Sequence, residues 1–275
     1  MKNEQLEQIA LEARKSFVRM SLLSGSGHIT SSASCLELLV SLYFGKSKMR
    51  YNASNPSWNK RDYLILSKGH AAMGLYCMLA EAGFISNKEL GTFCQRGTRL
   101  GGHPSLKIPG VETASGSLGH GLPFGVGAAL GMKLKKSDNC VYVITGDGEL
   151  QEGSNWEAAL SIIQFDLKNL IWVIDKNNLQ LSGNTDDIMC LGNLPERLTA
   201  IGFDLSEING HNYEEIAGAL SKQSNKPRVI IANTVKGYGY PSIENRTDWH
   251  GRKPNKEELE VILSDLGTTA EEIGL

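Results

Sequence analysis

The sequence predicts an α/β fold in which a parallel sheet carries helices on both faces. Two observations support this prediction. Short runs rich in β-branched and other aliphatic residues alternate along the chain with longer segments of helical periodicity. Glycine-rich loops follow the ends of these runs, and in such sheets ligands bind beyond the carboxyl ends of the strands. The sequence therefore predicts both the fold and the edge of the sheet that would carry a site.

The first half of the chain begins with a helical pattern. Residues 2–23 form a charged amphipathic segment, and a second helical pattern covers 34–45. The aliphatic run YLILS predicts a strand over 63–67, and helical patterns follow over 69–82 and 121–136.

The second half continues the alternation. The runs CVYVIT at 140–145 and LIWVID at 170–175 predict two strands, joined by a helix over 154–166. A helix over 212–223, a strand over 228–234 and a helix over 256–265 complete the series. No internal repeat, low-complexity tract or linker interrupts residues 24–250, so we expect a single domain over 1–275 with helical extensions at both termini.

Composition excludes several classes of protein. The formal net charge of -2 gives no basic excess for binding nucleic acid. The longest apolar stretches, VYVIT and LIWVI, are far too short to span a bilayer, and the N-terminal segment lacks the apolar part of a signal peptide. The sequence therefore predicts a cytoplasmic globular protein with neither a nucleic-acid nor a membrane partner.

The cysteines indicate neither a zinc site nor a disulfide framework. Their number is odd, they are scattered, and no CxxC pair occurs. We expect them to be buried free thiols. They are Cys35, Cys77, Cys94, Cys140 and Cys190.

An acidic turn follows the strand at 140–145. Asp147 lies between two glycines, and the next strand ends at Asn177 and Asn178. A right-handed crossover places the ends of adjacent parallel strands on one edge of the sheet, so these side chains can approach each other. Carboxylate, amide and carbonyl oxygens suit magnesium that also binds a phosphate. The alternative is that Asp147 caps the following helix and the asparagines form an ordinary turn.

Several segments together resemble a known family. The pattern GDG, followed by residues 149–176 and then NN, resembles the thiamine diphosphate fingerprint. The segments GDGELQEGSNWEAAL and NLIWVIDKNNLQLSG are similar to transketolase, as are SGHITSSASCLELLVSLYF, LSKGHAAMGLY, GGHPSLKIPGVETASGSLGHGLPFGVGAALGMKL and VKGYGYPSIENRTDWHG. The resemblance runs from about residue 10 to about residue 260. It implies the diphosphate-binding domain of the thiamine diphosphate-binding fold.

Each of the six histidines is next to a glycine in the sequence. Glycine lets a ligand approach the backbone, and imidazole can donate to phosphate or hydroxyl groups and move protons near neutral pH. For His211 we favour a structural role at the turn before a helix, and His120 stays open. The resemblance implies that His28 and His103 line the sugar channel, and that His70 and His250 lie near the diphosphate, with His250 also close to the reacting carbons.

The resemblance also implies a ligand set. Its metal ligands are Asp147, Asn177 and the carbonyl of Leu179, for Mg²⁺ or alternatively Ca²⁺ or Mn²⁺. Cofactor contacts are implied for Gly116, Leu118 and Gly148, as well as for Asn177, His70 and His250. Glu152 matches a glutamate at the subunit interface that connects paired cofactor sites. Two departures, GHITSS and GHA, lie where the family often has proline or glycine after the first histidine and GHG in the second motif, so they bear on sugar preference.

The resemblance implies an enzyme that works only with a partner. In this family, a glutamate on a second, pyrimidine-binding domain activates the cofactor, and that domain is not expected in these 275 residues. We therefore expect the N-terminal subunit of a split transketolase, inactive alone and assembled as two of each chain. Its reaction would transfer a two-carbon ketol unit from a ketose or ketose phosphate to an aldose.

Three alternatives stay open at this point. One is a 2-oxo acid dehydrogenase component, which would not be expected to carry both His28 and His103. Another is a relative that passes the two-carbon unit to a lipoyl or acyl-carrier group. A non-catalytic homologue would be expected to lack the metal ligands, yet Asp147 and Asn177 are both present.

Overall fold

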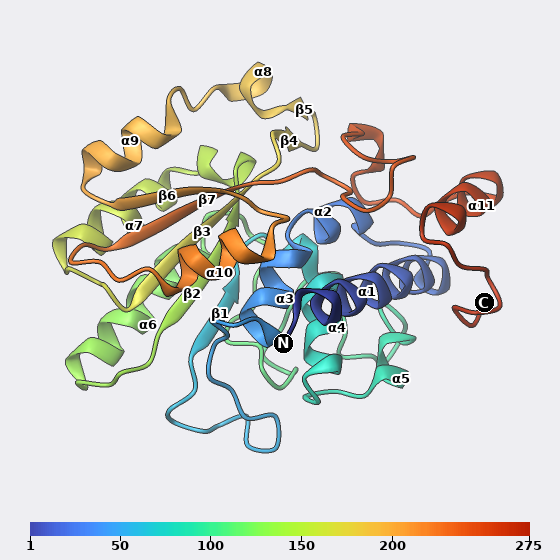
Figure 1. The fold of residues 1–275 in the computed structure, drawn as a ribbon, viewed down its shortest axis with the longest axis horizontal. Coiled ribbons are helices and arrows are strands. Elements are labelled where there is room, and N and C mark those ends of the chain that lie inside the picture. The colour runs from blue at the N-terminus through green and yellow to red at the C-terminus, as the bar shows by residue number, and fades with distance from the viewer.

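The computed structural model describes residues 1–275 and is built on one five-stranded parallel sheet (Figure 1). The strand order is β1-β2-β3-β7-β6. The strands are β1 (Tyr63–Leu66), β2 (Val141–Gly146), β3 (Leu170–Lys176), β6 (Asp204–Asn209) and β7 (Arg228–Asn233). A separate two-stranded ribbon joins β4 (Leu179–Gln180) to β5 (Gly183–Asn184). All four predicted strands are confirmed.

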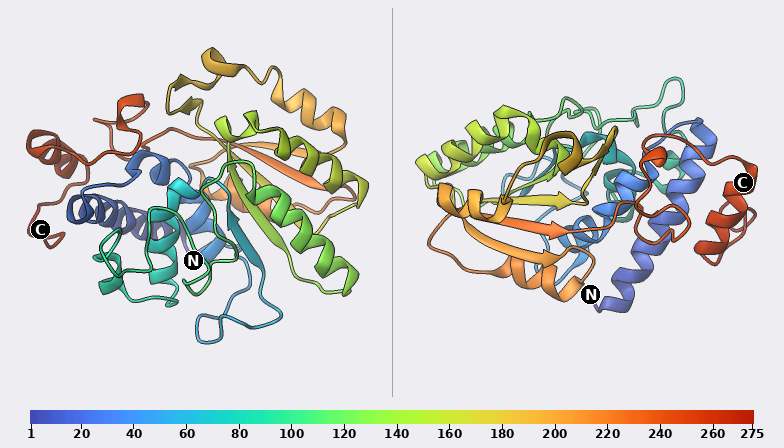
Figure 2. Two further views of the ribbon diagram at one scale, coloured as in Figure 1. Left: turned by 180° about the vertical axis from the view of Figure 1, so that it is seen from behind. Right: turned by 90° about the horizontal axis from the view of Figure 1, so that it is seen from above.

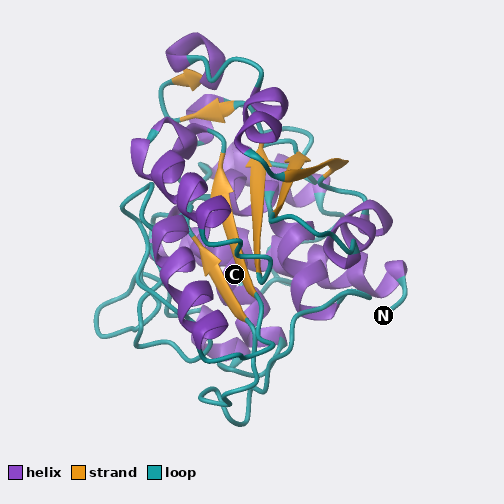
Figure 3. Cartoon of the chain, turned by 90° about the vertical axis from the view of Figure 1, so that its left-hand side faces the viewer, coloured by secondary structure: helices purple, strands orange, loops and turns teal.

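Helices cover both faces of the sheet, as predicted (Figures 2 and 3). The helices are α1 (Asn3–Ser24), α2 (Ile29–Ser34), α3 (Leu36–Phe44), α4 (Ala72–Glu81), α5 (Asn87–Leu90), α6 (Gly121–Leu134), α7 (Gly153–Gln164), α8 (Thr185–Met189), α9 (Leu194–Ile201), α10 (Tyr213–Ser221) and α11 (Lys256–Asp265). Short 3-10 turns occupy η1 (Gly69–Ala71), η2 (Gly148–Gln151) and η3 (Thr247–Trp249). Helices α6, α7 and α9 pack on one face, whereas α3, α4 and α10 pack on the other with α1 outside them.

Alternating strand residues belong to two separate cores. On β2, Val141 and Val143 join the core under α6 and α7, while Tyr142 and Ile144 join the larger core under α3 and α4. The side chains of a strand point to opposite faces in turn, so a strand covered on both sides is apolar throughout. This burial on both faces explains why the central strands were visible in the sequence as continuous aliphatic runs.

The structure differs from the prediction at several elements. The helix predicted over 34–45 corresponds to α3, which begins after Cys35, whereas the short helix α2 that Cys35 ends was missed. Strand β6 was missed because it lies at the edge of the sheet, where its sequence DLSEIN is polar and only partly buried. Helix α11, predicted over 256–265, matches its bounds and is supported by a capping box between Asn255 and Glu258.

The five cysteines are all free, but the prediction that they are buried is wrong for two of them. Cys35 and Cys77 are buried, and Cys140 is intermediate. Cys94 and Cys190 are exposed, because both lie in surface loops outside the helices that pack on the sheet. None of the helices combines the length and the apolar character needed to cross a bilayer.

Candidate active site

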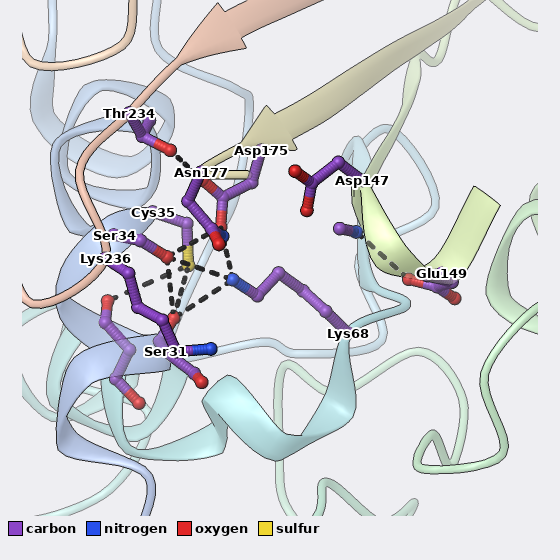
Figure 4. A network of polar contacts seen from close by, with 12 residues as sticks. Ser31, Ser34, Cys35, Lys68, Asp147, Glu149, Asp175, Asn177, Thr234 and Lys236 are labelled. Carbon is purple, nitrogen blue, oxygen red and sulfur yellow. Dashed lines mark hydrogen bonds and ion pairs between the residues drawn. The ribbon is translucent and has the colours of Figure 1, made fainter. Parts of the chain in front are cut away.

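The carboxyl ends of β2 and β3 bring the predicted acidic turn and the asparagine pair together (Figure 4). The Asp147 Oδ2 atom accepts a hydrogen bond of 2.6 Å from the amide of Asn178. Its Oδ1 atom accepts one of 2.8 Å from the amide of Gly148, so Asp147 also caps the turn η2, as the alternative interpretation expected. The prediction that the crossover brings Asp147 close to the asparagine pair is thus confirmed. Capping of η2 accounts for only one of the two carboxylate oxygens.

Asp147 is a buried carboxylate without a cationic partner. Only 4% of the residue is exposed, and its hydrogen bonds come from backbone amides alone. Burial, followed by repulsion from Asp175, raises the pKa of Asp147 to about 6. A buried carboxylate of this kind is stabilised by a bound cation.

Asp175, at the end of β3, organises the residues beside Asp147. It is fully buried and forms an ion pair with Lys68. It also accepts hydrogen bonds from the hydroxyls of Ser34, at 2.6 Å, and Thr234. The Asn177 Nδ2 atom donates to Asp175 at 3.2 Å, which turns the amide oxygen of Asn177 away from that carboxylate.

The oxygens expected to hold a metal form a mixed set. Asn177 Oδ1 accepts a hydrogen bond of 3.2 Å from the amide of Leu179 and keeps a second lone pair. No group of three or more His, Cys, Asp or Glu side chains in the structure is arranged to hold a metal ion. Because Asp147 is the only carboxylate in the expected set, that set relies on an amide and a carbonyl oxygen for its other ligands.

Two buried lysines, which sequence reasoning missed, face this region. Lys68 is 1% exposed; burial disfavours its charge, but Asp175 more than offsets this and the pKa of Lys68 is raised. Lys236 is 2% exposed and has no carboxylate partner, since its ammonium contacts only His250 Nδ1, at 3.1 Å. Burial, and then the charge of Lys68, lowers the pKa of Lys236 to about 8. The position of each lysine beside glycine, in SKGH and VKGYG, was the only available signal.

Four of the six histidines gather at the same edge of the sheet. The ring centre of His28 lies 5.4 Å from that of His70, 5.2 Å from that of His250 and 6.5 Å from that of His103. Burial, and then neighbouring positive charge, lowers the pKa of His28 to about 4 and that of His250 to about 3. These two rings are therefore neutral at pH 7 and can each donate and accept one hydrogen bond.

The other two histidines lie outside this group. His120 is exposed at the start of α6, where its Nδ1 atom lies 3.2 Å from the carbonyl of Leu118. His211 bonds to Glu37 and to the backbone of Val235, in agreement with the structural role favoured for it.

The predicted cofactor contacts lie on loops that pack tightly around the site. Gly116 has φ +139°, and a Cβ atom there would lie 2.8 Å from the imidazole of His103. A Cβ atom on Gly148 would lie 3.1 Å from Gln180. Leu118 is partly buried, and Glu152 is exposed at the start of α7. Side chains larger than glycine would therefore disturb the first two positions.

Glu149 is a further buried carboxylate that sequence reasoning missed. It accepts hydrogen bonds from the amides of Gly119, at 2.9 Å, and Gly146, at 3.1 Å, and from the hydroxyl of Ser67. Burial raises its pKa. Glu149 thereby ties the 115–119 loop to the ends of β1 and β2, and its place directly after GDG was the available signal.

The space around these residues contains unpartnered polar atoms. The buried oxygens Ser31 Oγ, Ser115 Oγ and Gln180 Oε1 have no hydrogen-bond partner. A cavity of about 230 Å³ adjoins Asp147 and Asn178. A larger cavity, of about 370 Å³, is lined by residues of α1, α4 and the C-terminal segment, and by none of the site residues. The smaller cavity is therefore the one that adjoins the expected metal ligand Asp147, whereas the three unpartnered oxygens line neither cavity.

Comparison with known proteins places this arrangement in a family. The model of the "transketolase, thiamine diphosphate binding domain" matches residues 18–273. The chain is 43% identical to one of the subunits of the apulose-4-phosphate transketolase of Actinobacillus succinogenes, and the match covers 96% of both chains. It is 36% identical to human transketolase, over 96% of this chain but 42% of the human protein. The crystal structure of Campylobacter jejuni transketolase superimposes with a TM-score of 0.92 at 32% identity, covering all of this chain and 44% of that one.

These findings confirm the predicted resemblance to an N-terminal transketolase subunit. Two relatives are named as single subunits of a transketolase, and the chain matches each of them over nearly its whole length. The chain belongs to the transketolase family and corresponds to its thiamine diphosphate binding domain.

Proposed function

We propose that this chain is the diphosphate-binding subunit of a split transketolase. It would transfer a two-carbon ketol unit from a ketose phosphate to an aldose, with thiamine diphosphate and a divalent metal as cofactors. One observation carries the proposal: a buried carboxylate without a cation, Asp147, and a buried ammonium without an anion, Lys236, lie at the same edge of the sheet. A metal ion with a diphosphate supplies the missing partner of each.

The residues present fit this pair of ligands. Asp147, the amide oxygen of Asn177 and the carbonyl of Leu179 would hold Mg²⁺, or Ca²⁺ or Mn²⁺ in its place. His70, Lys236 and the backbone of Gly148 would contact the diphosphate. When bound, thiamine diphosphate supplies the reactive carbon that accepts the two-carbon unit.

Three of the four grouped imidazoles would face the sugar. His28 and His103 would orient hydroxyl groups of donor and acceptor, and His250 would hold or move a proton beside the reacting carbons. Two relatives are named for apulose-4-phosphate and a third for 6-deoxy-6-sulfo-D-fructose. We therefore propose a ketose with an anionic terminal group as donor.

The partner would carry the pyrimidine-binding domain. Support comes from the relatives whose names describe them as single transketolase subunits, since such names imply a second chain. Exposed Glu152 would lie at the contact between subunits, and the assembly would be a cytoplasmic heterotetramer with two of each chain.

The test is ketol transfer by the purified chain, alone and co-purified with its pyrimidine-domain partner. With a ketose phosphate and an aldose as probes, we expect transfer only by the complex. Transfer by the isolated chain would contradict the split-enzyme proposal. A complex that transfers the two-carbon unit to a lipoyl group but not to any aldose would contradict the transketolase assignment.

A further inference from the structure

A polar cluster, buried except at Tyr238, lies against the loop that carries Lys236. Arg14 of α1 forms an ion pair with Glu37 of α3, and Glu37 Oε2 lies 2.8 Å from His211 Nδ1. Tyr238, on the loop itself, stacks on the His211 ring with 3.6 Å between ring centres and 15° between planes. We call these four residues the loop clamp. It joins segments that are far apart in sequence and includes none of the proposed site residues.

His211 bonds to the loop through one defined form of its ring. Its Nδ1 atom faces a carboxylate and therefore carries the proton, whereas its Nε2 atom accepts a hydrogen bond of 2.8 Å from the amide of Val235. A proton on Nε2 would abolish that acceptor. The ring consequently holds the loop at Val235 by hydrogen bonding and at Tyr238 by stacking.

Arg14 also holds this loop. Its Nε atom donates to the carbonyl of Tyr238 at 2.9 Å, and its guanidinium lies 5.3 Å from the centre of the Tyr238 ring. Gly239 has φ +86°, and a Cβ atom there would overlap the guanidinium. The loop backbone thus lies directly against Arg14, with no room for a shift towards it.

Lys236 lies between the two points at which the clamp holds the loop. Its ammonium contacts His250 and has no carboxylate to fix its position. The Gly237 amide donates to the carbonyl of Thr30 at 3.0 Å. The position of this ammonium therefore depends on how its backbone is held.

We propose that Arg14, Glu37, His211 and Tyr238 act as positioning residues that fix the Lys236 ammonium at the candidate active site. Burying an arginine and a glutamate is expensive compared with packing apolar side chains in their place. The directional bonds they form to Val235 and Tyr238 are what an apolar cluster could not provide. That the Lys236 ammonium meets a diphosphate rests on the proposed function; the clamp itself does not.

Two variants of His211 separate hydrogen bonding from stacking. His211→Phe keeps an aromatic ring against Tyr238 but loses the bonds to Glu37 and Val235. His211→Gln keeps a donor and an acceptor on a flexible side chain. The matched control is His120→Phe, which changes an exposed histidine outside the loop clamp.

The readout is the pH profile of Lys236 acetylation in the full chain, followed by peptide mass spectrometry with the surface lysines as internal reference. In wild type the midpoint is expected near pH 8. In His211→Phe, looser packing admits water to the ammonium, so the midpoint should rise by about one pH unit or more. His211→Gln should recover much of the wild-type profile, and His120→Phe should match wild type.

An unchanged midpoint in folded His211→Phe would overturn the proposal. If that variant does not fold, Tyr238→Leu tests the same contact at a side chain that is 36% exposed, with the same expected rise and the same contradicting result. Acetylation needs no cofactor, so the result stands apart from the proposed function. The acetylation profile could shift as expected while Lys236→Met leaves the thiamine diphosphate affinity of the complex unchanged. That pair of results would support the positioning role of the loop clamp and contradict the contact between Lys236 and the diphosphate.

Discussion

Replacing Asp147 by Asn should make the metal-free chain more stable at pH 7.5, although it removes the proposed metal ligand. In the folded chain, burial raises the pKa of Asp147 from 3.8 to about 6. Above pH 6 the carboxylate is charged in both the folded and the unfolded states, but only the folded state has the free-energy cost of burying that charge. This difference in pKa corresponds to about 3 kcal/mol.

The expected gain is smaller than this penalty, because Asn replaces one of the two accepting oxygens by a donor. Losing one backbone hydrogen bond, and placing the NH2 group of the new Asn against the backbone amide that donated it, costs about 1–2 kcal/mol. The net gain in the free energy of unfolding is therefore about 1–2 kcal/mol. Such a gain would show that the wild-type residue lowers the stability of the metal-free chain in order to provide a ligand at the proposed site.

The stability difference between Asp147→Asn and wild type should depend on pH in a defined direction. An acid whose folded pKa is raised becomes less destabilising as pH falls through that pKa, since the folded state binds the proton more tightly. The stability advantage of Asp147→Asn over wild type should therefore shrink between about pH 6 and pH 4. Below that range the carboxyl is neutral in both states, so the variant should be the less stable of the two because it has lost a hydrogen bond.

Urea unfolding of both chains with EDTA, at pH 7.5 and at pH 5, measures the difference. A variant that is less stable than wild type at pH 7.5 would refute the reasoning, because the charge of Asp147 would then already have a partner within the chain. Asp138→Asn is the matched control, since that carboxylate is exposed.

Three further predictions concern the assembled complex. His103→Ala should lower the rate of ketol transfer roughly 10- to 100-fold by removing hydrogen bonds to the sugar, with thiamine diphosphate affinity nearly unchanged in calorimetry; a large loss of cofactor affinity would count against its channel role. Lys236→Met should weaken cofactor binding by about 1.5–3 kcal/mol, the worth of a hydrogen bond to a charged group, and equal affinities would exclude the contact. Gly116→Ala should displace the His103 ring and slow transfer, because a Cβ atom there lies 2.8 Å from that ring; full activity would show that the ring has other room.

The sequence allowed the central part of the fold to be predicted for a physical reason. Strands β2 and β3 are covered on both faces, so their residues form continuous aliphatic runs. Strand β6 lies at the edge and is partly exposed, so its polar sequence resembled a loop. Helix α9 was missed as well, although Asn193 caps it and Pro195 lies in its first turn.

The site could be predicted where the chain topology decides it. Asp147 and Asn177 belong to one βαβ unit, and the crossover alone places their strand ends side by side. Lys68, Lys236 and Glu149 were missed because a charged residue is by default expected at the surface. The burial of Lys68 and Glu149 depends on partners, Asp175 and Ser67, that come from other parts of the chain.

Calorimetric titration of thiamine diphosphate into the assembled complex, with Mg²⁺ or with EDTA, tests the central claim most directly. We expect tight binding with Mg²⁺, its loss in EDTA, and no recovery by Mg²⁺ in Asp147→Ala. Equal affinity in EDTA and in Mg²⁺, or an unchanged affinity of Asp147→Ala, would contradict the claim that the ends of β2 and β3 hold the cofactor through a divalent ion.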